Sequence, residues 1–217
     1  MEIKIDRLIR SSRRTYQLEI DPRGELTVRL PRRFSFKALE QLLQDKAAWI
    51  EKHRQKAREK AERTPPCSWD EGGTLLLLGA EYPIKTAPRQ RKNAEFREDT
   101  FFLKAGLPNP KKALEQCLRE EAAKILAPRL ELLSRQGNFQ YRRLGITGAK
   151  KRWGSCNSKG NISLSWRLIQ TPLAVVDYVI SHELMHLKIP NHSRRFWQEL
   201  EKFYPQTREA RRRLKEC

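Results

Sequence analysis

Three of the four histidines in this 217-residue chain lie within the eleven-residue stretch "HELMHLKIPNH", from His182 to His192. His182 and His186 are four residues apart, so on a helix both side chains project from one face, about one turn apart. Each imidazole can then direct one nitrogen at the same ion. Glu183 follows about 100° round the helix, where it can approach an ion-bound water without being a ligand. This spacing predicts a zinc site with Glu183 as the catalytic general base.

Two histidines do not complete such a site, because a catalytic zinc usually has three protein ligands and one open position. A continuous helix would carry His192 about 9 Å beyond His186 along the axis. Pro190 provides a break that lets the chain fold back. We therefore predict one zinc ion per chain, held by His182, His186 and His192. Other residues stay open as the third ligand: Glu199, Glu201 and Cys156.

Zinc bound in this way lowers the pKa of its water from ~15.7 toward ~7. Glu183 is placed to accept the proton of that water as it attacks a peptide carbonyl, and then to deliver it to the leaving amine. The sequence therefore predicts hydrolysis of peptide bonds in a protein or peptide substrate. The candidates for a further group that stabilises the oxyanion are Tyr178, Tyr204 and Arg152.

The elements that must position these residues can be read around them. Thr171 as cap and Pro172 at the first helical position, followed by "LAVVDYVISHELMHLKI", predict a helix that ends at Pro190. Ser193 is a cap for a further helix, and the basic tail is helical. The range Lys151–Leu168 alternates apolar and polar residues around the turn signature "NSKG", which predicts a β-hairpin with one buried face.

The earlier part of the chain is expected to be rich in strands. The alternation around "DPRG" predicts a hairpin over Thr15–Leu30, and Ser35 then caps one long helix. Thr64–Gly73, "TPPCSWDEGG", is typical of a connector. The strand-like segments "TLLLLGAEYPIKTA" and "DTFFLKA" follow it.

A second long helix starts with Asn109 as cap and Pro110 at its first position, and it ends at Gly137. Pro128 is expected to kink or split it. We divide the chain into a β-rich N-terminal region, residues 1–108, and a catalytic region, residues 109–217.

Composition adds expectations about partners. The chain has 45 lysines and arginines against 26 acidic residues, a formal net charge of +19, which favours weak, sequence-independent binding of DNA or RNA. No stretch resembles a signal peptide or a membrane span. The four cysteines form no CxxC pair, so we expect a cytoplasmic protein without a disulfide framework.

The segments "KRWGSCNSKGNISLSWRLI" and "PLAVVDYVISHELMHLKIPNHSRRFW" resemble the YgjP-like zinc metallopeptidases, which are related to SprT-type proteases. The resemblance is strong over Lys151–Trp197 and looser over nearly the whole chain. It implies an α+β fold with a zincin-like metallopeptidase core, His182, His186 and His192 as zinc ligands, and Glu183 as the catalytic glutamate.

Two other functions stay open. A zinc-dependent endoribonuclease would suit the positive charge, and the YbeY-like ribonucleases share the H-x3-H-x5-H spacing. Those proteins lack a glutamate beside the first histidine, whereas Glu183 is present here. The other alternative is a nucleic-acid-binding protein with a structural zinc, although structural sites are usually closed and rich in cysteine. The sequence indicates neither the natural substrate nor the oligomeric state.

Overall fold

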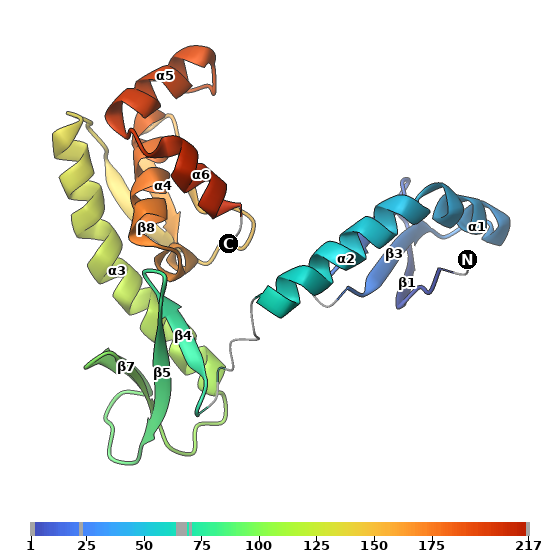
Figure 1. Ribbon diagram of the computed structural model, residues 1–217, viewed down its shortest axis with the longest axis horizontal. Coiled ribbons are helices and arrows are strands. Elements are labelled where there is room, and N and C mark those ends of the chain that lie inside the picture. Colours follow the sequence, from blue (N-terminus) through green and yellow to red (C-terminus); the bar gives the residue numbers. More distant parts are fainter. Residues whose placement is uncertain (1–2, 22–23, 64–68, 70, 216–217) are drawn as a thin grey trace. The chain divides into compact units, whose positions relative to one another are not determined.

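The computed structural model describes residues 3–21, 24–63, 69 and 71–215 (Figure 1). The chain folds into two compact units, Met1–Cys67 and Ser68–Cys217. The boundary predicted between residues 108 and 109 lies elsewhere, because the strands before it share one hydrophobic core with the helix after it. Most of the predicted connector Thr64–Gly73 lies outside the described residues. Among the described helices, none has both the length and the apolar character needed to span a membrane.

The first unit is a three-stranded sheet covered on one face by helices. The strands are β1 (Arg7–Ser11), β2 (Gln17–Ile20) and β3 (Leu26–Pro31), in the order β1-β3-β2. β2 and β3 pair antiparallel, so the predicted hairpin is confirmed, and β1 pairs with β3 in parallel. The buried side of β3 forms a small core with the helices that follow.

The helical part of this unit starts as predicted but is divided in two. Ser35 caps α1 (Phe36–Asp45), and its hydroxyl accepts a hydrogen bond from the Ala38 N–H at 3.2 Å. α1 ends at Lys46, and α2 (Ala47–Arg63) follows. The expected single long helix is therefore wrong. Leu39 of α1 and Ile50 of α2 both enter the core of β3, so two successive helices cover the sheet.

The second unit begins with a four-stranded sheet in the order β4-β5-β7-β6. Its strands are β4 (Thr74–Leu77), β5 (Ala80–Ala87), β6 (Ala94–Arg97) and β7 (Thr100–Lys104). The sequence predicted strands in the segments that hold β4, β5 and β7. It did not predict β6. The long helix α3 (Pro110–Gln136) begins at Asn109 and Pro110 and ends at Gly137, as predicted.

Pro128 does not split α3, because the helix runs through it as one element. An interior proline costs about 3 kcal/mol through a lost hydrogen bond and a clash with the preceding turn. Leu126, Leu130 and Leu133 lie on either side of it and are buried in the main core. Burying a leucine side chain contributes about 1.5–3 kcal/mol, so packing outweighs the local penalty.

A second sheet of this unit leads into the histidine helix. Its strands are β8 (Arg143–Thr147), β9 (Gly154–Cys156) and β10 (Asn161–Ser165), in the order β8-β10-β9. β9 and β10 pair antiparallel, which confirms the predicted hairpin, and β8 pairs with β10 in parallel. The 3-10 helix η1 (Trp166–Gln170) then carries the chain to α4.

The last three helices are α4 (Leu173–Met185), α5 (Arg194–Phe203) and α6 (Thr207–Leu214). Thr171 does not cap α4, since its hydroxyl donates back to the Leu168 carbonyl at 2.8 Å. α4 also ends at Met185, earlier than the predicted end at Pro190. Ser193 occupies the N-cap position of α5 as predicted, but its side chain makes no capping hydrogen bond. The basic tail forms α6, which packs beside α4 (Figure 1). The α+β class is confirmed.

Candidate metal centre

The structure brings the three clustered histidines together. One ring nitrogen from each of His182, His186 and His192 lies within 4.8 Å of the others. The Nε2 atoms of His182 and His192 are 2.9 Å apart. His182 and His186 are half-buried, and His192 is exposed. Three converging imidazoles are a donor set that suits a divalent zinc ion, and a catalytic zinc usually combines three protein ligands with one open position.

The end of α4 explains why His192 can reach the other two. His186 is the C-cap residue that follows Met185, and it keeps near-helical backbone angles, with φ −63° and ψ −19°. The chain then makes a tight turn in which the Ile189 N–H donates to the Met185 carbonyl at 2.9 Å. This turn precedes Pro190 and sends the backbone back toward the helix. The helix break that we predicted from Pro190 is present, but it begins about one helical turn before Pro190.

The same turn orients one of the candidate ligands. Nδ1 of His186 lies 3.2 Å from the Ile189 carbonyl oxygen. A carbonyl can only accept, so Nδ1 carries the proton and leaves Nε2 free to bind an ion. Nδ1 of His182 is buried and has no hydrogen-bond partner among the described residues.

The surroundings favour neutral imidazoles. Burial lowers the pKa of His182 to about 4, and His186, His192 and Arg211 act in the same direction. Burial also lowers the pKa of His186, although its hydrogen bond to the Ile189 carbonyl opposes this. Only the unprotonated ring has a lone pair for a metal. The site therefore holds these two histidines in the form that binds a cation.

Glu183 lies in a buried position beside the histidines, with 7% of its surface exposed. Burial raises the pKa of its carboxyl to about 7, while the nearby Arg152 and a hydrogen bond from the Cys156 backbone N–H oppose the rise. A carboxyl group with this pKa can both take up and release a proton near neutral pH.

Gly154 makes room for that carboxyl, a role that the sequence reasoning missed. A Cβ atom at Gly154 would lie 2.7 Å from both Cγ and Oε1 of Glu183. Any side chain there would displace the glutamate. The only sequence signal for this role was the tripeptide Trp-Gly-Ser at a short strand. That signal does not indicate which residue packs against the glycine.

β9, which carries Gly154, is an edge strand. The backbone bonds from Ser165 N–H to Trp153 O and from Asn157 N–H to Asn161 O fix the hairpin register. Pairing alternates along an antiparallel ladder, so the peptide groups of Gly154 face away from β10. The Cys156 N–H points in the same direction and donates a hydrogen bond to the Glu183 carboxylate. The free edge of the sheet thus borders the site.

The other candidate third ligands have different partners. Glu199 pairs with Lys202 at 2.8 Å, and Glu201 pairs with Arg208 at 3.0 Å. Cys156 lies near Glu183, and its thiol donates to the Asn157 carbonyl at 3.6 Å. Within the described residues, the group of converging ligand atoms consists of the three histidines.

The three candidates for stabilising an oxyanion differ in their surroundings. The Tyr204 hydroxyl donates to the Ala174 carbonyl at 2.9 Å, which commits it to joining α5 and α4. Tyr178 lines a cavity of about 200 Å³ together with His182 and Glu183. Arg152 is exposed, and its charge acts on Glu183 from the rim.

The fourth histidine has no part in this centre. His53 lies in the first unit, where its ring stacks on Trp49 with centroids 4.1 Å apart and its Nδ1 lies 2.8 Å from the Trp49 carbonyl oxygen. It is a packing residue of α2.

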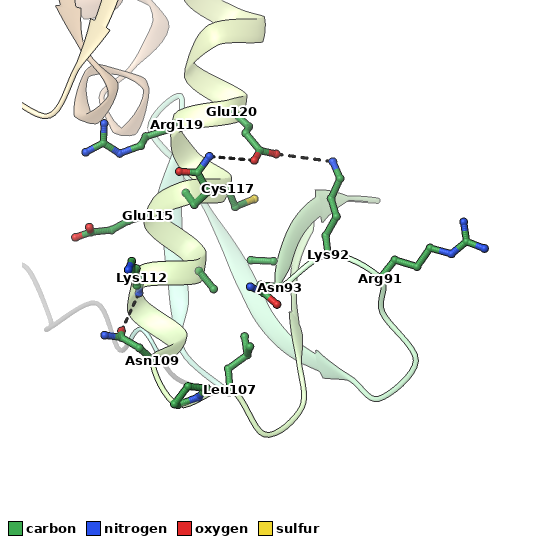
Figure 2. A pocket seen from close by; sticks show the side chains of 14 residues that line it. Arg91, Lys92, Asn93, Leu107, Asn109, Lys112, Glu115, Cys117, Arg119 and Glu120 are labelled. Atoms are coloured by element: carbon green, nitrogen blue, oxygen red, sulfur yellow. Dashed lines mark hydrogen bonds and ion pairs between the residues drawn. The ribbon is translucent and has the colours of Figure 1, made fainter.

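A larger cavity of about 780 Å³ lies between β6 and the start of α3 and includes none of the histidines (Figure 2). Lys92 reaches across it toward Glu120, with Nζ and Oε2 3.7 Å apart, while Arg91 points away into solvent (Figure 2). Burial raises the pKa of the Cys117 thiol there to about 12, so it is not a reactive nucleophile. This cavity carries no recognisable chemistry.

Two comparisons cover only parts of the chain. A 69-residue stretch is 30% identical to the ribonuclease P protein components of two Histophilus somni strains, 2336 and 129Pt, over 30% of this chain. The match spans 58% of the length of those relatives. The crystal structure of the metallopeptidase zymogen abylysin from Pyrococcus abyssi matches 42% of this chain and 91% of its own, with 26% identity and a TM-score of 0.38.

A family model covers far more of the sequence. The model of the YgjP-like metallopeptidase domain matches residues 14–217, which include most of the first unit, all of the second unit and all three clustered histidines. This range contains every residue of the candidate centre, so the resemblance noted in the sequence extends over nearly the whole chain. The chain belongs to the YgjP-like metallopeptidase family.

Proposed function

We propose that this chain is a zinc-dependent peptidase in which His182, His186 and His192 hold one metal ion and Glu183 is the general base. The observation that carries the proposal is the buried Glu183 carboxyl, held between Gly154 and the Cys156 N–H beside three converging imidazoles. A bound zinc ion would supply Lewis-acid polarisation of the peptide carbonyl and make a water molecule easier to deprotonate.

The chain's own groups account for the proton transfers. Glu183 accepts a proton from the attacking water on a carboxylate oxygen and passes it to the amine as the peptide bond breaks. Its pKa of about 7 suits both steps at neutral pH. Burial excludes bulk water, which would otherwise compete as a proton acceptor.

Other groups position the substrate. The free edge of β9 at Gly154 offers peptide groups to an extended substrate strand, as β-augmentation requires. Tyr178 is the candidate for stabilising the developing oxyanion, because it lines the cavity next to His182 and Glu183 whereas the Tyr204 hydroxyl is already bonded.

The test compares two variants of the zinc-loaded chain. Glu183→Gln keeps the side-chain size but cannot accept a proton, so hydrolysis should fall by about 10²–10⁴-fold with zinc retained. His186→Ala should lose zinc and activity together. Self-cleavage of the concentrated protein and cleavage of unfolded protein substrates provide the readout, and zinc is measured by metal analysis. Wild-type rates in a zinc-loaded Glu183→Gln sample would refute the assignment.

A second candidate function is RNA binding. The observation in its favour is the 30% identity over 69 residues with ribonuclease P protein components, and the net charge of +19 agrees with it. We expect weak, sequence-independent binding whose affinity falls steeply with salt, because each phosphate contact releases counterions. Titration of a labelled RNA at two salt concentrations tests this. An absence of binding at low salt would remove the candidate.

A further inference from the structure

A small cavity adjoins Glu183, the proposed general base. Its volume is about 200 Å³, and its lining consists of Trp153, Gly154, Tyr178, Val179, His182, Glu183 and Leu214. Pockets that hold whole small ligands measure about 300–1,000 Å³, so this one suits a single side chain. Trp153, Val179 and Leu214 give it apolar walls.

The C-terminal helix α6 supplies one of these walls and a charge beside it. Leu214 and Arg211 are three residues apart, so they project from the same side of α6. The Arg211 guanidinium lies over the Trp197 ring at 4.4 Å from its centroid. Trp197 in turn stacks on His192, with centroids 5.7 Å apart and planes at 25°. Arg211 is therefore fixed at the rim of the metal centre.

A second arginine, Arg152, borders the site from the segment just before β9. Arg152 immediately precedes Trp153 and Gly154 of the cavity wall, and it is exposed. In the described part of the chain, the side chains of Arg152 and Arg211 form neither an ion pair nor a hydrogen bond, and the Arg211 guanidinium contacts the Trp197 ring. Both positive charges act electrostatically on groups of the site: Arg152 on Glu183, and Arg211 on His182.

The acidic residues of the neighbouring helices are occupied by other cations. Their ion pairs are Glu199 with Lys202, Glu201 with Arg208, and Glu209 with Arg213. Apart from the Glu183 carboxyl, on which the charge of Arg152 acts, Arg152 and Arg211 thus present positive charge at the site that no carboxylate of these helices pairs with. A ligand that brings an apolar side chain and negative charge together would complement both features.

We propose that this site selects peptides with an apolar side chain next to the scissile bond, seated against Leu214 and Trp153, and with an acidic side chain beside it, recognised by Arg211 and Arg152. The inference rests on the proposed peptidase function and specifies its substrate class. Both arginines are at the surface, so each contributes a screened attraction of up to about fivefold in affinity.

The test measures binding without turnover. Zinc-loaded full-length protein carrying Glu183→Gln is titrated with fluorescently labelled peptides of equal length that centre on one leucine, flanked either by glutamates or by lysines. The glutamate peptide should bind about tenfold more tightly at low salt, and the difference should shrink at high salt. Adding Arg211→Gln should weaken binding of the glutamate peptide about fivefold and should leave the affinity for the lysine peptide equal or higher, because a repulsive charge is removed.

The matched control removes the same charge from the same helix. Arg212 is exposed on α6 and lines none of the cavity, so Arg212→Gln should leave both affinities within twofold of the starting protein. An equal loss in the two variants would mean that general surface charge attracts the peptide, and the proposal would be overturned. An oligonucleotide of equal charge that depends on Arg211 as strongly as the peptide does would also overturn it.

The cavity is tested separately by filling it. Leu214→Trp should weaken a leucine-centred peptide by about tenfold relative to an alanine-centred one, while an unchanged ratio would remove the cavity from the proposal. Leu214→Phe provides a milder substitution if the larger one unfolds the protein. Peptide binding that depends on Arg211 without any hydrolysis by the wild type would refute the peptidase function alone. Hydrolysis at rates that do not depend on the acidic or the apolar side chains of the peptide would refute the proposed selectivity alone.

Discussion

Replacing Gly154 with alanine should damage catalysis without touching a metal ligand. The added Cβ would lie 2.7 Å from Cγ and Oε1 of Glu183 and 3.0 Å from its Cδ. Carbon atoms in contact prefer a separation of about 3.5–4.0 Å, so the carboxyl must move by about 1 Å. Glu183 is 7% exposed, and the adjoining cavity of about 200 Å³ is the space into which its carboxyl would shift, away from its present position.

The expected magnitude follows from that displacement. A misplacement of about 1 Å at a reacting group can lower the rate by about 10²-fold. The close contact between the added Cβ and Glu183 is expected to cost about 1–3 kcal/mol of the free energy of unfolding. We therefore expect Gly154→Ala to lower kcat/KM by roughly 10²-fold while zinc content remains at the wild-type level.

The assay combines hydrolysis of a protein substrate, metal analysis and denaturant unfolding on the same preparations. Gly145→Ala is the matched control in the same sheet, because a Cβ there would meet Ser163 Oγ at an ordinary 3.6 Å. It should keep both activity and stability. A zinc-loaded Gly154→Ala protein that hydrolyses substrate at the wild-type rate would refute the inference that this glycine positions Glu183.

Two further predictions concern the metal and the first unit. His192→Ala should lose most of its bound zinc, whereas Glu199→Ala should keep it, and metal analysis of the two purified variants decides between them. Asp6→Asn should lower the free energy of unfolding at neutral pH by about 1–3 kcal/mol, since the Asp6 carboxylate accepts the Leu26 N–H at 2.7 Å. That hydrogen bond, with help from Arg54, holds the pKa of Asp6 below its usual 3.8. The contribution is therefore present above pH 3.8 and is lost as the pH falls through the lowered pKa. Urea unfolding as a function of pH should show this loss in the wild type, and an equal loss in Asp6→Asn would contradict it.

Local patterns predicted the elements well where the periodicity was strong. The alternation over Lys151–Leu168 and around "DPRG" predicted two hairpins that the structure contains. Asn109 and Ser35 start helices where expected, because a cap depends on residues within one turn. Predictions that depended on packing were less accurate. α3 continues through Pro128 because buried leucines on both sides offset the local cost.

The sequence by itself determined which residues could form the metal centre. Spacing on one helix turn places His182 beside His186, and Pro190, which cannot donate a helical hydrogen bond, favours the turn that returns His192. Only the tertiary structure decided that Gly154 lies against Glu183 and that Arg211 stacks over Trp197 at the rim. Those contacts join segments far apart in the chain. Helix periodicity acts over a few residues, whereas distant contacts depend on how whole elements share one core, which no short pattern encodes.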